Sequence, residues 1–170
     1  VDIPSVDVPA GYTTLFVFPY SVGFQFSGFK NLAALNEAIT KRLKNLGVTT
    51  LLFMRHLELI EYEIKIPGKE ASGEYLLDAE PVNDHCTRVS AIESEDDKTD
   101  ESLSFIKFSM PIDSRVSTRT IDVAFTVATD KEGKTTFQKA KNPYISVYFP
   151  TETESKLDFI VQGPFRTTPN

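Results

Sequence analysis

Residues 57–66 read LELIEYEIKI, and this stretch decides the fold. From Leu59 to Ile66 every even position is Ile or Tyr, whereas three of the four odd positions are charged. Side chains in a β-strand point alternately to opposite faces, so an alternating sequence buries one face and exposes the other. The stretch therefore predicts a strand in an antiparallel sheet that has one face in the core and one face in water.

Strand-like sequence continues on both sides of this stretch. Residues 13–20 (TTLFVFPY) predict an earlier short strand that ends near Pro19, because β-branched and aromatic residues favour strands. After residue 66, a hairpin connection from Pro67-Gly68 to Ser72-Gly73, an acidic loop at 93–101 and a turn at 130–133 separate further candidates. The later strands are expected at 74–79, 88–93, 104–110, 120–128, 144–149 and 157–161.

One helix interrupts the strands, between residues 31 and 46. Leucine or isoleucine recurs there at steps of three or four residues, basic residues fill the last turn, and Gly47 follows as a stop. Thr49-Thr50 either caps a second short helix through residues 51–53 or precedes a buried strand. The expected fold is α+β, a mostly antiparallel sheet with one or two helices near the N-terminus.

The bulk composition bounds the function. The chain has 170 residues, enough for one domain with a real core, and a formal charge of −6 without a clustered basic face. Binding of nucleic acid through this segment is therefore not expected. A single cysteine excludes an internal disulfide, and no apolar run reaches the roughly 20 residues that span a bilayer. Since no signal peptide is visible either, we expect a cytoplasmic protein without a membrane partner.

The usual catalytic and metal-binding patterns are weak or missing. His85 and Cys86 are adjacent, but neighbours on a strand point to opposite faces, which argues against a nucleophile–base pair. His56 adds no regular ligand spacing, so no metal site is expected. The acidic loop at 93–101 lacks the ligand pattern and glycine of a calcium loop and indicates a solvated hairpin tip. Since phosphate-loop and nucleophile-elbow motifs are also absent, the sequence predicts no self-sufficient active site.

The C-terminal stretch is the most distinctive part of the chain. Residues 147–152 (VYFPTE), with Pro150 and Thr151, are expected to end one strand at the proline, and LDFIV at 157–161 forms the next. The following residues are Gln162, Gly163, Pro164, Phe165, Arg166, Thr167, Thr168 and Pro169. Gly163 permits a turn that Pro164 fixes, so Arg166 is presented beside two hydroxyl groups as a candidate for facing an anion. The alternative is a plain hairpin exit.

These residues carry a resemblance to a known family. The pattern FPTE…LDFIVQGPFRTTP is similar to the middle region of large ATPases related to sacsin and the ninety-kilodalton heat-shock chaperones, in the GHKL superfamily with gyrase B and MutL. Residues 11–20 resemble the strand that closes the ATPase domain in that family. Residues 51–57 (LLFMRHL) and 121–125 (IDVAF) resemble two later elements. The step Glu154-Ser155-Lys156 departs from the usual Thr-Gly.

The resemblance implies that the chain contains parts of two domains. Residues 1–20 correspond to a linker and the closing strand of an upstream ATPase domain, and residues 21–170 to a transducer-like domain. The family's catalytic Glu, magnesium-binding Asn and Asp-x-Gly-x-Gly turn are not in this sequence, so ATP and Mg would bind upstream in a parent protein, which relatives suggest is a homodimer. This chain would then be non-catalytic and couple nucleotide state to distal parts, with Arg166 and then Arg55 as nucleotide-sensing candidates.

Two other functional classes stay open. One is a β-rich protein-interaction module without a nucleotide link. The other, which the sequence favours least, is a stand-alone hydrolase that uses His85 or His56.

Overall fold

A computed structural model describes residues 10–11, 28–95, 101–112, 120–141, 143–147 and 149–165, except for the side chains of Glu101 and Glu152. The chain divides into two compact units, Val1–Arg42 and Leu43–Asn170. The expected early strand at 13–20, and the domain boundary expected at residue 20, lie outside the described residues.

Helix α1 spans Leu32–Lys44, within the range that the leucine spacing predicts. Asn31 caps its start, because the Asn31 side-chain oxygen accepts a hydrogen bond from the Ala34 amide at 2.9 Å. The helix ends three residues before Gly47, which has the positive φ of 77° that suits glycine. Among the described residues, no helix has the length and apolar character needed to cross a membrane.

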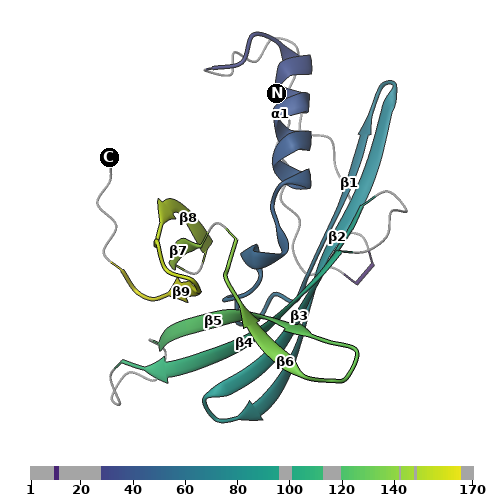
Figure 1. Ribbon diagram of the computed structural model, residues 1–170. Helices are drawn as coiled ribbons and strands as arrows, with labels where there is room; N and C mark the ends of the chain where they lie inside the picture. The colour runs from purple at the N-terminus through teal and green to yellow at the C-terminus, as the bar shows by residue number, and fades with distance from the viewer. Residues whose placement is uncertain are drawn as a thin grey trace. The chain divides into compact units, whose positions relative to one another are not determined.

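The second unit is built on one sheet (Figure 1). Its strands are β1 (Leu59–Ile66), β2 (Lys69–Asn83), β3 (Cys86–Glu95), β4 (Glu101–Pro111), β5 (Thr120–Thr129), β6 (Thr135–Gln138), β7 (Tyr144–Val147), β8 (Phe149–Glu154) and β9 (Ile160–Gln162). Their order is β1-β2-β3-β4-β5-β9-β7-β8, and β6 pairs with β5. Among the described strands every pairing is antiparallel except that of β7 with β9, so the expected mostly antiparallel sheet is confirmed.

The β1–β2 hairpin is tighter than the sequence suggested. Only Pro67-Gly68 forms the turn, with Gly68 at a φ of 76°, and β2 starts at once. The expectation that Ser72-Gly73 belongs to the connection is wrong. Gly73 lies inside β2 opposite Tyr62, and a Cβ at Gly73 would overlap the Tyr62 ring. This glycine therefore makes room for an aromatic side chain, a role of strand glycines that a turn-based interpretation misses.

The core lies on one face of the sheet, under the segment that follows Gly47. Val48–Thr50 forms a 3-10 helix, and residues 51–53 continue as a turn with buried side chains. They pack against buried residues of the sheet, among them Tyr75, Val89, Phe105 and Ala124. The second helix is thus a short 3-10 turn that Thr49-Thr50 do not cap, and the alternative of a buried strand at 51–53 is wrong.

The C-terminal strands differ most from expectation. The single strand predicted at 144–149 is two strands, β7 and β8, which form a hairpin, and Pro150 lies within β8 instead of ending a strand. β8 is at the edge of the strand order, where proline is tolerated because one side of the strand needs no backbone donor. The last strand, predicted at 157–161, is the short β9. The four-residue β6 was not predicted.

The opposite face of the sheet also carries apolar side chains. The ring of Phe125 has three aromatic neighbours, Phe108 at 6.1 Å, Phe137 at 5.6 Å and Phe159 at 5.1 Å between centroids. Phe137 on β6 is 65% exposed and Met110 on β4 is 69% exposed. We call this surface the outer aromatic face.

Candidate functional site

A row of three buried polar residues crosses the C-terminal half of the sheet. Gln162 on β9 pairs with Asp122 on β5 and with Ser146 on β7. Directly paired residues place their side chains on the same face, and Asp122 is two residues from the fully buried Ala124, so this is the core face. Asp122 is 9% exposed, and Gln162 and Ser146 are each 2% exposed. We call these three residues the polar row.

Two basic residues, Arg55 and Lys107, lie near the Asp122 end of the row, and we call them the basic cluster. Thr120 donates its hydroxyl to Oδ2 of Asp122 at 3.0 Å, and Nη2 of Arg55 donates to the same Thr120 hydroxyl at 3.3 Å. Lys107 on β4 donates from Nζ to the carbonyl of Leu52 at 3.3 Å. The loop after the 3-10 helix supplies Arg55, and adjacent strands supply Lys107 and Thr120. Residues far apart in sequence are thus assembled around one carboxylate.

The pKa of Lys107 reflects the charges that surround it in this cluster. Burial lowers the pKa of its ammonium below the ordinary 10.5, the negative charge of Asp122 opposes that shift, and the positive charge of Arg55 adds to it. Arg55 and Lys107 therefore lie close enough to repel each other, with Asp122 as the carboxylate that compensates them. Two cationic side chains thus lie beside one carboxylate, and cationic donors of this kind favour an approaching anion.

The side chain of Gln162 carries a buried oxygen, Oε1, without a hydrogen-bond donor among the described residues. A buried acceptor without a donor costs free energy, on the order of 1–3 kcal/mol, so such a group calls for a functional or structural explanation.

The backbone of the predicted C-terminal motif is held against β7. The Gly163 amide donates to the carbonyl of Ser146 at 3.2 Å, and the Phe165 amide donates to the carbonyl of Gly163 at 2.8 Å. The Phe165 ring lies over Gly163, where an added Cβ would be 3.2 Å from the ring edge. Pro164 is exposed. Gly163 thus provides a close approach as well as a turn.

The other residues singled out from the sequence take different places. On β8, the Thr151 hydroxyl donates to the Ile145 carbonyl at 2.7 Å and stabilises the β7–β8 hairpin. The preceding residue, Pro150, pairs with Ser146 on β7. His85 lies in the β2–β3 turn and Cys86 begins β3. Arg166, Thr167 and Thr168 lie outside the described residues, so their proposed role stays a prediction.

The structure places Arg55 beside the polar row that contains Gln162, because Arg55 donates to Thr120 and Thr120 donates to Asp122. The sequence alone did not indicate this proximity. The sequence interpretation missed Lys107, Thr120, Asp122 and Ser146. A signal was available for Lys107 and Asp122, since each is a charged residue two positions from a buried one, Phe105 and Ala124 respectively, within a strand. A charged residue at a strand position whose side chain points to the core is unusual, and such a position is a candidate for a functional role.

Comparisons of the chain with protein-family models, with curated proteins and with solved structures found no match.

Proposed function

We propose that this chain is a non-catalytic, transducer-like coupling domain of a larger GHKL-type ATPase, in which it carries the nucleotide state of an upstream domain to distal parts. The main support is the link between the basic cluster and the C-terminal motif. Arg55 and Gln162 were singled out separately, and both adjoin Asp122, Arg55 through Thr120 and Gln162 through strand pairing.

The charges of the cluster suit such a role. Burial lowers the pKa of Lys107, and the repulsion of Arg55 lowers it further. A phosphate group that arrives beside both cations relieves this repulsion and stabilises their charged forms. Because Asp122 already balances these cations, the anion changes the interactions of Asp122, and Asp122 is paired with the strand that leads into the motif. A change at the phosphate can thus reach β9.

The test is ATP turnover by the intact protein that contains this chain. We expect Arg55→Ala, Lys107→Met and Arg166→Ala each to lower turnover by about tenfold or more, as removal of a charge-stabilising donor does elsewhere, without loss of folding. Lys107→Met keeps the buried alkyl stem and removes only the charge. Lys134→Ala, an exposed lysine in the β5–β6 turn, is the matched control and should leave turnover unchanged.

A second measurement uses the isolated chain. Because the nucleotide pocket is proposed to lie upstream, calorimetry should detect no ATP binding and a phosphate-release assay no hydrolysis. Tight ATP binding by this chain alone, or unchanged turnover in all three variants, would show that the proposal is wrong.

The alternative is a protein-interaction module without nucleotide linkage, and the outer aromatic face favours it. Large apolar side chains at 65–69% exposure, Phe137 and Met110, are typical of surfaces that bind another protein. Under this alternative, Phe137→Ser abolishes partner binding, whereas Arg55→Ala has no effect on it and nucleotide does not change it.

A further inference from the structure

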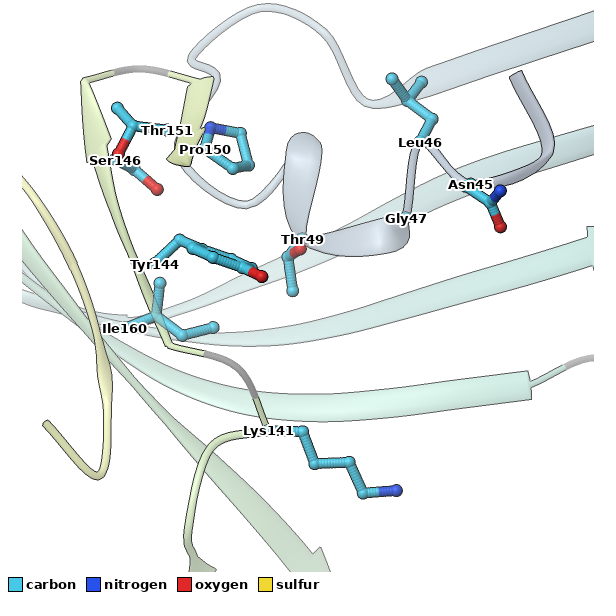
Figure 2. Close-up of a pocket in the computed structure, with 10 residues that line it drawn as sticks. All are labelled: Asn45, Leu46, Gly47, Thr49, Lys141, Tyr144, Ser146, Pro150, Thr151 and Ile160. Atoms are coloured by element: carbon cyan, nitrogen blue, oxygen red, sulfur yellow. The ribbon is translucent and has the colours of Figure 1, made fainter. Parts of the chain in front are cut away.

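A cavity of about 490 Å³ opens between the loop that precedes the 3-10 helix and the β7–β8 hairpin (Figure 2). Its volume is within the range of about 300–1,000 Å³ that is usual for small-molecule sites. Figure 2 shows the Tyr144 ring extending from β7 toward Thr49, with Ile160 beside it and Pro150 on the neighbouring strand. All of the lining residues belong to the second unit, Leu43–Asn170.

Most of the polar side chains that line this cavity lack a partner among the described residues, whereas the Thr151 hydroxyl donates to the carbonyl of Ile145. The hydroxyls of Thr49, Tyr144 and Ser146, the amide of Asn45 and the ammonium of Lys141 take part in no side-chain hydrogen bond or ion pair among the described residues. Ser146 is the most telling, because it is 2% exposed and still lacks a partner for its hydroxyl. If this position served packing alone, alanine would be more stabilising there than serine, because a buried hydroxyl without a hydrogen bond costs free energy.

The chemistry of the lining selects a ligand class. Five of the lining residues carry hydrogen-bond donors without a partner among the described residues, one of these donors is the Lys141 cation, and no carboxylate is among the described residues that line the cavity. The ring of Tyr144 and the side chains of Pro150 and Ile160 offer flat apolar walls. We propose that this cavity binds a small organic anion, a planar ring that bears a carboxylate or phosphate group.

Each part of the site has a distinct task. The ring of the ligand lies against Tyr144 and Pro150, and its anionic group accepts hydrogen bonds from Ser146 and Thr49. Lys141 is exposed and stands apart from the other side chains in Figure 2, so it attracts the anion at the mouth of the cavity. Because Ser146 is paired with Gln162, the bound ligand also adjoins the polar row. The site does not depend on the proposed ATPase linkage.

The test is a titration of the ¹⁵N-labelled chain, followed by two-dimensional NMR, with three probes that share a phenyl ring. Benzoate and phenyl phosphate carry the anionic group, whereas benzamide is neutral. We expect benzoate or phenyl phosphate to shift the amide signals of Tyr144, Ser146 and Thr49, and the stronger of the two distinguishes a carboxylate from a phosphate site. Added salt should weaken binding, because screening reduces the attraction of Lys141.

Variants separate binding from folding. Ser146→Ala, Thr49→Val and Lys141→Ala should each raise the Kd of the anion at least threefold, while Ser146→Ala leaves the unfolding midpoint unchanged or raises it. Ser90→Ala, on the other face of the sheet, and Lys134→Ala are the matched controls and should keep the wild-type Kd. Equal binding of benzamide, shifts confined to residues outside the cavity, or wild-type Kd values in all three variants would overturn the proposal.

Discussion

The substitution Tyr75→Phe tests how the sheet holds the segment that begins at Leu43. Tyr75 on β2 is 1% exposed, and its hydroxyl donates to the carbonyl of Leu43 at 2.7 Å. Phenylalanine keeps the ring and removes the donor, so the Leu43 carbonyl loses this bond. We expect the free energy of unfolding at pH 7 to fall by about 1–2 kcal/mol, the usual cost of breaking one buried hydrogen bond.

The same residue predicts a pH dependence. Burial, and then the negative charge of Glu93 and the interaction with Tyr62, raise the pKa of Tyr75 from 10.0 to about 12. A folded-state pKa above the unfolded one means that the stabilisation is complete below pH 10 and is lost as the pH rises toward 12. With 1.36 kcal/mol for each pKa unit, the full loss is about 3 kcal/mol, and roughly half of it has occurred at pH 11.

Urea unfolding of both proteins between pH 7 and pH 11.5 checks this reasoning. The wild type should be more stable by about 1–2 kcal/mol at pH 7, and the two stability curves should meet near pH 11, since only the wild type carries the Tyr75 titration. Contributions of other groups, Lys107 included, cancel in the difference. Tyr144→Phe, whose hydroxyl has no partner among the described residues, is the control. Curves that stay parallel over the whole range would refute the argument.

Three further outcomes follow from the contacts of the second unit. Gly73→Ala should lower the free energy of unfolding by about 1–3 kcal/mol, because the new methyl group displaces the Tyr62 ring; an unchanged urea midpoint would contradict this. Arg55→Ala should raise the pKa of Lys107, measured by NMR of the lysine side chain, since a repelling charge is removed. Asp122→Asn should lower the same pKa further, because the compensating charge is lost, and a Lys107 pKa that ignores both changes would show that the cluster does not exist in solution.

Much of the fold follows from local sequence patterns. The alternation from Leu59 to Ile66 indicates both that β1 is a strand and which of its faces is buried, and Tyr62 and Ile64 are buried as it predicts. The leucine spacing before Gly47 gives the helix, and Asp130–Gly133 forms the predicted turn, in which Oδ1 of Asp130 accepts from the amides of Glu132 and Lys134. These features depend on interactions between residues a few positions apart, so the local sequence is enough to predict them.

The sequence-based predictions are wrong where the structural role of a residue depends on a residue far away in the chain. Gly73 suggested a turn, but its requirement comes from Tyr62 across the hairpin. Pro150 suggested the end of a strand, but it is accommodated because β8 lies at an edge. Proline within a strand is itself a sign of an edge strand, but the place of β8 beside β7 depends on tertiary packing.

The candidate sites divide in the same way. By itself the sequence predicted the helix, the strands β1 to β5, their succession along the chain and the distinctive stretch from Gln162 to Phe165. Only the tertiary structure decided that Asp122, Gln162 and Ser146 form one buried row, and that Thr49 and Tyr144 face one cavity. The physical reason is that periodicity fixes the face on which a side chain lies, whereas its neighbours across the sheet depend on which distant strands pair.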